Sequence, residues 1–305
     1  MRLGITIAMS LAAVSASAMT LAQGEGDPLR RPVAPEYAKR WLQPQAPIRV
    51  FGNGYLVGFG GLNVGLIKTS AGLILIDGAL PQSVDAVEAN IRTFGFDPKQ
   101  IRYILSTEPH YDHASGIAAL ARDSGATVLA GIPAAKALRQ GHSDSDDPQA
   151  AILEAYAPIA NVRGMRDGEQ VRLGDTVVTA HATPGHTLGS MSWSWRSCEG
   201  KRCLNMVFAS SLNPISADDW RFTDPAHRAI VDGFRHSFAV MRALPCDVLM
   251  TAHPDQSGGD AKYARLVERR VPNPYIDPKA CRAYVDKHEA LLKARLAKEA
   301  KVSGA

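Results

Sequence analysis

The chain has 305 residues, of which 46% are hydrophobic and 21% are charged, and its formal net charge is +4. This length suits one large domain or two small ones. The mild, spread-out charge gives no case for binding to nucleic acid. Beyond the N-terminus, no apolar run is long enough to form a transmembrane helix.

The N-terminal residues differ in composition from the rest of the chain. One early cation is followed by an uncharged run of small and apolar residues, 3–18. Ala16-Ser17-Ala18 fits a small-residue cleavage signal, and Thr20-Leu21-Ala22 is a second candidate. We therefore expect a signal peptide over residues 1–22, cleaved near residue 18 or 22, and one mature domain over 23–305 in the periplasm. A buried N-terminal helix is the alternative.

The segment from Gly24 to Pro47 is rich in Pro, Gln and charge, which predicts an extended lead-in. Trp41 within it would cover a surface or the rim of a cleft. Short β-prone runs follow, separated by turns at Gly52-Asn53-Gly54 and Ser70-Ala71-Gly72. We expect strands at 48–51, 55–59, 63–67 and 73–76.

Helices and strands alternate in the next part of the chain. Helical spacing predicts helices at 83–93, about 117–124 and 132–138, and apolar runs predict strands at 101–105 and 126–130. The polar, acidic stretch Gly141–Gln149 is expected to be a mobile loop.

After residue 170 the β-prone runs return. We expect two strands within 171–183, split at Gly174-Asp175, then strands at 191–195, 206–209 and 248–251 and a helix at 234–244. Asp277-Pro278 is expected to start a terminal helix, with Asp as N-cap. Two β-rich halves, each followed by helices, predict an α/β sandwich of two sheets with helices outside.

The four cysteines are an even number, which predicts disulfides in an oxidising compartment. Cys198 and Cys203 flank a polar turn that could close a hairpin. Cys246 and Cys281 would then pair and tie the late core to the C-terminal helix. Zinc ligation by cysteine is the alternative, but no Cys-x-x-Cys spacing supports it.

A dense group of potential metal ligands follows the predicted strand 101–105. His110, Asp112 and His113 offer two imidazoles and a carboxylate, and zinc accepts both ligand types. Pro109 excludes an ordinary central strand or helix interior, so these side chains are expected on a loop. A polar turn with Asp112 as a helix N-cap is the alternative.

Two further histidines also follow predicted strands. His186 lies between Pro184-Gly185 and a turn of small residues, and His253 follows the strand 248–251. Alone, each would more often be a structural histidine. Three histidine-bearing loops at three strand ends, however, can converge on one rim of a two-sheet sandwich.

Taken together, these stretches resemble the metallo-β-lactamase superfamily from Asn63 through His253. The resemblance includes the strand before Asp77, an aspartate that buttresses the metal loop in the family. Within the superfamily the chain is most similar to subclass B3. The motifs that indicate B3 are Pro184-Gly185-His186-Thr187 followed by Gly189-Ser190 and Trp193, Ser211-Leu212, His253-Pro254 and the late cysteine pair.

The resemblance implies the fold of the family, a four-layer αβ/βα sandwich of two mixed β-sheets with helices on the outer faces. It also implies two zinc ions as cofactors. One zinc would be bound by Glu108, His110 and His186, and the other by Asp112, His113 and His253.

Glu108 departs from the family pattern. The first loop of the family reads His-x-His-x-Asp-His, and Glu108 replaces its first histidine. The added negative charge would weaken the zinc there as a Lewis acid. A mononuclear enzyme with Glu108 turned away is the alternative.

The implied activity is hydrolysis of the β-lactam ring of penicillins, cephalosporins and carbapenems, which confers antibiotic resistance. A metal-bound hydroxide oriented by Asp112 would attack the ring. Ser211 resembles the B3 serine that holds a metal-bound water, and Asn213 lies where the family binds the substrate carboxylate. Trp41 is a further candidate substrate contact. For Asn213, a turn residue before Pro214 is the alternative. The expected partner is a small-molecule β-lactam, and we expect a monomer.

Two other functions stay open. One is another hydrolase of this fold, such as a lactonase or thioesterase. Such relatives place a metal-bridging aspartate, and subclasses B1 and B2 place a cysteine, where this chain has Ser210-Ser211. The other is a non-catalytic metal-binding protein, for which a broken ligand set would be expected.

Overall fold

The computed structural model describes residues 26–303, so the expected signal peptide lies outside the described residues. Within that range the strands form a seven-stranded sheet, in the order β1-β2-β3-β4-β5-β6-β7, and a five-stranded sheet, in the order β12-β11-β10-β9-β8. The first sheet contains β1 (Ile48–Phe51), β2 (Gly54–Leu56), β3 (Gly65–Thr69), β4 (Gly72–Ile76), β5 (Ile101–Leu105), β6 (Thr127–Gly131) and β7 (Val162–Met165). The second contains β8 (Gln170–Leu173), β9 (Thr176–Ala182), β10 (Met191–Glu199), β11 (Arg202–Ala209) and β12 (Val248–Thr251).

Each sheet combines antiparallel and parallel strand pairs. In the first sheet β1 to β4 are antiparallel neighbours, and β4 to β7 run parallel. Parallel strands that are buried on both faces have nearly continuous apolar sequences, and Leu73–Ile76 are no more than 2% exposed. In the second sheet β8 to β11 are antiparallel, and β12 joins β11 in parallel.

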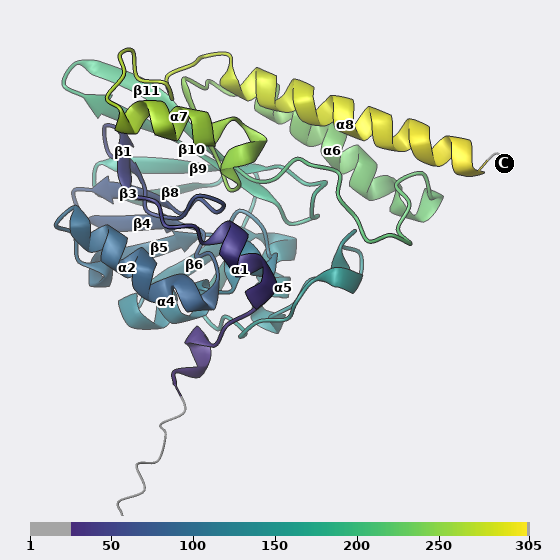
Figure 1. Cartoon of the computed structure of the whole chain (residues 1–305), viewed down its shortest axis with the longest axis horizontal. Helices are drawn as coiled ribbons and strands as arrows, with labels where there is room; N and C mark the ends of the chain where they lie inside the picture. Colours follow the sequence, from purple (N-terminus) through teal and green to yellow (C-terminus); the bar gives the residue numbers. More distant parts are fainter. Residues whose placement is uncertain (1–25, 304–305) are drawn as a thin grey trace, which may run out of the picture.

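Helices cover the outer faces of both sheets (Figure 1). The first sheet is covered by α2 (Val84–Thr93), α4 (Ile117–Ser124) and α5 (Ile132–Gln140), and the second by α6 (Arg228–Ala243) and α8 (Ala280–Ser303). The remaining α-helices of the described chain are α1 (Pro35–Trp41), α3 (Tyr111–Ala114) and α7 (Gly259–Val267). The 3-10 turns are Pro28–Arg30, Pro81–Ser83, Pro98–Gln100, Ala150–Ile152, Pro225–His227 and Pro254–Gln256.

Alternation along the strands assigns side chains to the layers. In β4, Leu73 and Leu75 pack under the helices of the first sheet, whereas Ile74 and Ile76 face the second sheet. In β11, Phe208 faces the first sheet, and Val207 and Ala209 pack under α6 and α8. The apolar clusters therefore fill the spaces between four layers, and the predicted αβ/βα sandwich of two mixed sheets is confirmed.

The lead-in expected to be extended contains helix α1, so that prediction was wrong. Pro35 lies in the first turn of α1, Glu36 is also in that turn, and Lys39 and Arg40 lie in the last turn. This order of charges favours a helix because it complements the helix dipole. The high content of Pro and Gln around the segment concealed these local signals.

Other elements also differ from the sequence-based expectations. Asp112 and His113 lie in the short helix α3 and not on a loop, because Pro109 precedes that helix and does not interrupt it. Helix α6 begins at Arg228 rather than at Phe234, and the sequence did not predict β7 or α7. Gly164 interrupts the short strand β7, which weakens its β-prone pattern. Asp277 behaves as a cap near the start of α8, because its Oδ1 accepts a hydrogen bond of 2.9 Å from the Lys279 N–H.

The four cysteines form the disulfides Cys198–Cys203 and Cys246–Cys281. The first joins opposite positions of the β10–β11 hairpin. The second connects Cys246, which lies just before β12, to Cys281 in the first turn of α8. No cysteine of the described chain is free to bind a metal.

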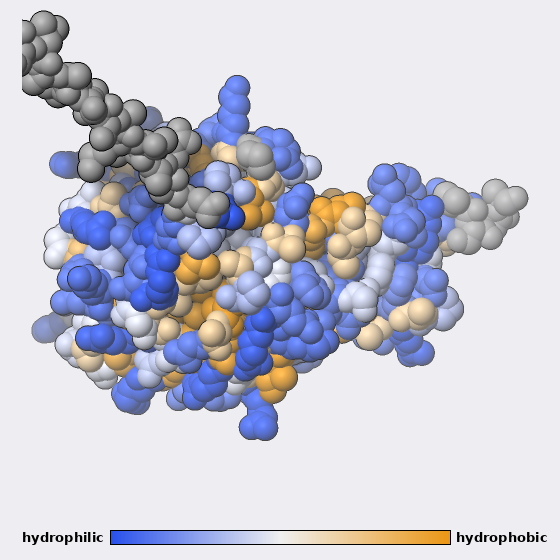
Figure 2. All heavy atoms as spheres, turned by 90° about the horizontal axis from the view of Figure 1, so that it is seen from below, coloured by the Kyte–Doolittle hydropathy of each residue, from blue (hydrophilic) through white to orange (hydrophobic). Residues whose placement is uncertain are grey.

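Helix α8 runs along α6 and extends beyond the two sheets (Figure 1). It contributes Cys281, Tyr284, Val285 and Leu292 to the outer core of the second sheet. On the face shown in Figure 2, the end of the molecule near the C-terminus is mainly hydrophilic. Among residues 26–303, no helix has both the length and the apolar composition needed to cross a bilayer.

Candidate metal centre

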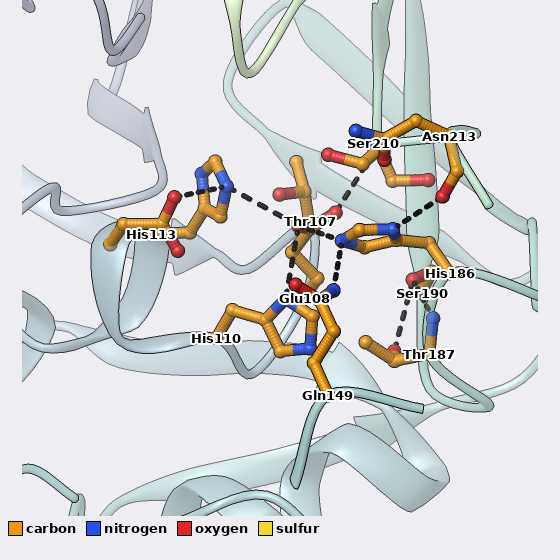
Figure 3. A network of polar contacts seen from close by, with 12 residues as sticks. Thr107, Glu108, His110, His113, Gln149, His186, Thr187, Ser190, Ser210 and Asn213 are labelled. Carbon is orange, nitrogen blue, oxygen red and sulfur yellow. Dashed lines mark hydrogen bonds and ion pairs between the residues drawn. The ribbon is translucent and has the colours of Figure 1, made fainter. Parts of the chain in front are cut away.

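Four strand ends bring polar residues to one edge of the sandwich. Asp77 follows β4, the stretch 107–113 follows β5, His186 follows β9 and His253 follows β12. Figure 3 shows Glu108, from the stretch after β5, among the side chains of His110, His113 and His186. Glu108, His110, His113 and His186 are each no more than 5% exposed. The loops therefore place a carboxylate and several imidazoles in a largely water-excluded space.

The first candidate metal group consists of Glu108, His110 and His186, whose potential ligand atoms all lie within 4.8 Å of one another. Glu108 Oε1 lies 3.3 Å from His186 Nε2 and 3.7 Å from His110 Nδ1. The other carboxylate oxygen, Oε2, accepts a hydrogen bond of 2.9 Å from the Ser211 N–H. Glu108 is thus turned into the group and not away from it.

The second candidate group consists of Asp112, His113 and His253, and it meets the same 4.8 Å criterion. Asp112 Oδ2 lies 3.3 Å from His113 Nε2 and 3.1 Å from His253 Nε2. Glu108 Oε1 is also 3.2 Å from His113 Nε2, so the two groups adjoin. The six residues singled out in the sequence are therefore brought together in the two expected sets of three.

Backbone carbonyls orient two of the histidines. His186 Nδ1 donates to the Asn213 oxygen at 2.9 Å, and His253 Nδ1 donates to the Gly61 oxygen at 3.2 Å. In each ring, Nε2 is therefore the nitrogen that faces the group and can offer a lone pair.

Asp77 holds the stretch after β5 in place, as the sequence suggested. Its Oδ1 accepts a hydrogen bond from the Thr107 N–H and its Oδ2 accepts one from the Thr107 hydroxyl, each at 2.7 Å. Asp77 has a φ angle of 63°, in the left-handed region that is uncommon for a residue with a side chain. These hydrogen bonds compensate for that backbone conformation and fix the start of the ligand loop.

The loop that carries His186 depends on the absence of a side chain at Gly185. Gly185 has a φ angle of 134°, and a Cβ atom there would lie 2.6 Å from Phe234 Cγ in α6. The Ser237 hydroxyl of the same helix donates to the Pro184 oxygen. Close packing of α6 against this loop therefore sets the position of His186.

The surrounding histidines favour the ionised forms of Glu108 and Asp112. Burial alone would raise the pKa of the Glu108 carboxyl, but attraction to His186 and His113 outweighs burial and holds that pKa well below its usual range. For Asp112, burial is likewise outweighed by His113 and His253, and its pKa is also lowered. Burial lowers the pKa of the His113 imidazole. The site therefore favours two negative carboxylates that require nearby positive charge.

The residues present fit zinc. Glu108 Oε1 is buried and has no hydrogen-bond partner among the residues that the structure describes. His113 Nε2 and His253 Nε2 lie only 3.1 Å apart, beside two carboxylates. Imidazole nitrogens and carboxylate oxygens are common zinc ligands, and three protein ligands per zinc leave a position open for water or substrate.

The candidate substrate residues lie around these groups. Ser211 Oγ and Asn213 Oδ1 are buried and lack hydrogen-bond partners within the described part of the chain. The Trp41 ring centroid lies 6.1 Å from that of His253. Trp41 and His253 also line one cavity of about 200 Å³.

Two residues at the site were not identified from the sequence. Asp147 Oδ2 lies 2.8 Å from His110 Nε2, and Gln149 Nε2 lies 3.3 Å from His186 Nε2. Both belong to the stretch Gly141–Gln149, which the sequence suggested was a mobile loop, yet Asp147 and Gln149 are only 4% and 8% exposed. Their acidic and polar neighbours gave no sign that the end of this loop is buried.

The sequence and the fold are similar to those of known proteins. The sequence model of the metallo-beta-lactamase superfamily matches residues 57–200. Among solved structures, a B3 metallo-beta-lactamase with an active-site glutamic acid is 54% identical, and the match covers 90% of this chain and 98% of that chain with a TM-score of 0.83. The Rm3 metallo-beta-lactamase is 43% identical over 87% of this chain and 98% of that chain, with a TM-score of 0.84.

A third structure, the subclass B3 metallo-beta-lactamase BJP-1 of Bradyrhizobium japonicum, is 35% identical over 87% of this chain and 99% of that chain, with a TM-score of 0.78. More distant sequence relatives are hydroxyacylglutathione hydrolases. The protein of Anaeromyxobacter dehalogenans (strain 2CP-C) is 32% identical over 43% of this chain and 40% of that protein. The protein of Bradyrhizobium sp. (strain ORS 278) is 30% identical over 61% of this chain and 62% of that protein. The chain thus matches less than two thirds of the length of these hydrolases.

The chain belongs to the metallo-β-lactamase superfamily. Within this class it is a hydrolase of the subclass B3 type, since its matches to B3 structures run through nearly their whole length.

Proposed function

We propose that this chain hydrolyses the β-lactam ring of penicillins, cephalosporins and carbapenems with two bound zinc ions. The observation that carries the proposal is the convergence of Glu108, His110 and His186 beside Asp112, His113 and His253. The whole-length similarity to B3 metallo-beta-lactamases supports the same substrate class. Release of the chain into the periplasm, where it would act as a monomer and confer resistance, belongs to this proposal.

Zinc supplies a water of lowered pKa and a Lewis acid for a carbonyl oxygen when it is bound. The remaining work falls to residues of this chain. Asp112, a buried carboxylate whose pKa is lowered by His113 and His253, would orient the attacking water. Ser211 Oγ, which has no hydrogen-bond partner among the described residues, offers a hydrogen bond to the water, and the side-chain N–H of Asn213 would donate to the substrate carboxylate. Trp41 packs against the substrate beside His253.

Glu108 is proposed as a zinc ligand although it replaces the first histidine of the family pattern. Its unpartnered Oε1 points at His186 and His110, which supports ligation. A B3 metallo-beta-lactamase with an active-site glutamic acid supports the same role. The negative charge of Glu108 lowers the Lewis acidity of the zinc it binds, so we propose slower turnover than a histidine would allow.

Thioester hydrolysis is the second candidate, because hydroxyacylglutathione hydrolases are among the relatives. The site residue that separates the two activities is Ser211, with Ser210 before it. An aspartate in this stretch bridges the metals in thioesterase-like relatives, and neither serine can supply such a carboxylate.

The proposal is tested with the purified chain lacking residues 1–22. Hydrolysis of a chromogenic cephalosporin and of a carbapenem is measured before and after metal removal by a chelator, beside hydrolysis of a hydroxyacylglutathione thioester. We expect chelator-sensitive β-lactam turnover, which zinc restores, and an Asp112→Ala variant about 10²–10⁴-fold slower. Thioester turnover without β-lactam turnover would transfer the proposal to the second candidate.

A further inference from the structure

Asp147 lies outside both candidate ligand groups but touches one of their members. Its carboxylate is buried, and Oδ2 lies 2.8 Å from His110 Nε2. Its Oδ1 accepts a hydrogen bond of 2.8 Å from the Gln149 N–H. Both oxygens of this carboxylate are therefore directed by specific contacts.

The contact determines which nitrogen of His110 can bind a metal. An ionised carboxylate only accepts hydrogen bonds, so Nε2 of His110 must carry the proton that is shared with Asp147. The lone pair of the neutral ring is then on Nδ1, which is the nitrogen that lies 3.7 Å from Glu108 Oε1. His186 and His253 are arranged in the opposite way, with Nδ1 donating to a backbone carbonyl and Nε2 facing the group.

His110 also differs from these two histidines in the charge of its partner. A carboxylate increases the basicity of an imidazole ligand more than a neutral carbonyl does, and it resists rotation of the ring. The carboxylate of Asp77, by contrast, is 3.6 Å from His113 Nδ1, which is too long for a hydrogen bond. Within the described chain, His110 is thus the candidate ligand with a hydrogen-bonded carboxylate behind it.

The loop presents Asp147 in a fixed position. The Asp147 N–H donates to the Asp144 oxygen and the Asp147 oxygen accepts from the Ala150 N–H, both at 3.0 Å. The Ala217 N–H donates to the Pro148 oxygen at 2.8 Å, which joins this loop to the segment after Asn213. The carboxylate is therefore held by contacts within the protein itself, so no ordering of the loop opposes its action.

We propose that Asp147 is a positioning residue that fixes His110 as the Nε2–H tautomer and thereby makes Nδ1 the metal-binding atom of the Glu108 group. This inference rests on the zinc-binding part of the proposed function, but it does not depend on which substrate is hydrolysed. Its consequence is tighter zinc binding by the group that contains Glu108.

The test compares Asp147→Ala and Asp147→Asn with Asp146→Asn in the zinc-loaded mature chain. Asp146 is the exposed neighbour of Asp147, so its substitution makes the same charge change away from His110. The affinities of the two zincs are measured by competition with a chromophoric chelator. The ring nitrogens of His110 are followed by ¹⁵N NMR.

In the wild type we expect a protonated Nε2 and a metal-shifted Nδ1 at His110. Asp147→Ala should weaken one zinc about 10–100-fold and leave the other unchanged. Asp147→Asn, whose amide oxygen can still accept from Nε2–H, should keep the tautomer and lose less affinity. Asp146→Asn should match the wild type.

A proton on Nδ1 of His110 in the zinc-loaded wild type would overturn the inference. Unchanged zinc affinities in both Asp147 variants, or an equal loss of both zincs, would also overturn it, because the effect would then be absent or merely structural. A wild type that binds one zinc with no NMR change at His110 would overturn it together with the two-zinc site. Normal zinc binding without β-lactam turnover would contradict the proposed function alone.

Discussion

Glu108 is a carboxylate whose neighbours are the imidazoles of both metal groups. Its Oε1 lies 3.3 Å from His186 Nε2 in one group and 3.2 Å from His113 Nε2 in the other. Because Glu108 is 0% exposed, water cannot stabilise its charge. A bound cation would compensate for this charge. A neutral side chain at position 108 would not require such a cation.

Replacing Glu108 by Gln should weaken zinc binding by the first group. The amide oxygen can still accept the hydrogen bond from the Ser211 N–H, so the packing is preserved while the charge is lost. We expect at least about a 100-fold loss in the affinity of one zinc, more than the loss of an outer partner causes. Zinc per chain is measured by mass spectrometry of the metal after dialysis against limiting zinc.

Glu108→His is the matched variant, because it restores the histidine of the family pattern. It should retain two zincs and raise the rate of β-lactam hydrolysis, since a neutral ligand leaves the metal a stronger Lewis acid. If Glu108→Gln held two zincs as tightly as the wild type, ligation by Glu108 would be wrong.

The six clustered residues could be predicted because their spacing in the loops is a local property of the sequence. Asp147 could not, since its contact with His110 joins residues 37 positions apart. Two other acidic residues, Asp144 and Asp146, precede it in the same loop, and the sequence does not distinguish a buried carboxylate from an exposed one. Only the packing of the loop against the strand ends separates Asp147 from Asp146.

At the scale of elements, helix α8 anchors the segment that follows Asn213. Arg295 Nη2 donates to Ser216 Oγ at 2.8 Å and to the Trp220 oxygen at 3.2 Å. Glu299 pairs with Arg295 and accepts a hydrogen bond of 2.9 Å from the Thr223 N–H. The C-terminal half of the helix therefore restrains a loop that begins at the candidate metal centre.

Arg295→Ala should loosen this loop and raise KM for β-lactams about tenfold, with a smaller change in kcat. Loss of hydrogen bonds from a charged donor costs on the order of 1.5–3 kcal/mol, part of which the loop regains by relaxing. Steady-state kinetics with a chromogenic cephalosporin measure the change. Lys293→Ala is the control on the same helix, because the Lys293 side chain is 72% exposed. Equal KM values for the two variants would show that the anchor does not act on the site.

The same helix contains a buried histidine that makes stability depend on pH. His288 is 1% exposed, and its Nδ1 lies 2.7 Å from the Tyr284 oxygen. Burial lowers the pKa of His288 from 6.5 to about 4. The unfolded chain therefore binds a proton in this pH range that the folded chain does not.

The contribution of the neutral His288 to the free energy of unfolding is therefore complete above pH 6.5, and it is lost as the pH falls towards 4. The free energy of unfolding should fall by roughly 2–3 kcal/mol more in the wild type than in His288→Gln over this range. Urea unfolding at several pH values measures the difference between the two proteins. Parallel curves for the two proteins would contradict the assignment.

The elements themselves were predictable where periodicity was strong, as in β4, β5 and α4. The prediction of an extended lead-in was wrong because α1 has only seven residues. Its periodicity is too short to outweigh the surrounding Pro and Gln. Strand β7 is specified by its pairing with β6, in which Val162 lies opposite Val128, and not by its own composition.

On the scale of the whole molecule, two disulfides constrain very different lengths of chain. Cys246–Cys281 closes a loop with a sequence separation of 35, which includes α7 and reaches α8. Cys198–Cys203 spans a separation of only 5 within a hairpin. Loop-closure entropy therefore predicts that Cys246–Cys281 stabilises the fold more than Cys198–Cys203.

Replacing Cys246 and Cys281 by Ala should lower the free energy of unfolding by about 4 kcal/mol, against about 2 kcal/mol for Cys198 and Cys203. The order of the two losses is the prediction, and guanidinium unfolding of both double variants measures it. A larger loss from the hairpin disulfide would contradict the loop-length argument.

The candidate metal centre lies between the two sheets, since its potential ligands follow β5 in one sheet and β9 and β12 in the other. Metal that binds only the folded chain stabilises it. Zinc removal should therefore lower the unfolding temperature of the whole domain as well as abolish turnover. An unfolding temperature that is independent of zinc would argue against a centre that bridges the sheets.

The most direct measurement is a zinc titration of the metal-free mature chain, with bound zinc and chromogenic cephalosporin hydrolysis recorded together. We predict two bound zincs per chain and a turnover rate that reaches its maximum only as the second binds. A chain that binds two zincs without hydrolysing the cephalosporin would contradict the β-lactamase function. Full turnover with a single zinc would contradict the role of Glu108 as a ligand in the catalytic centre.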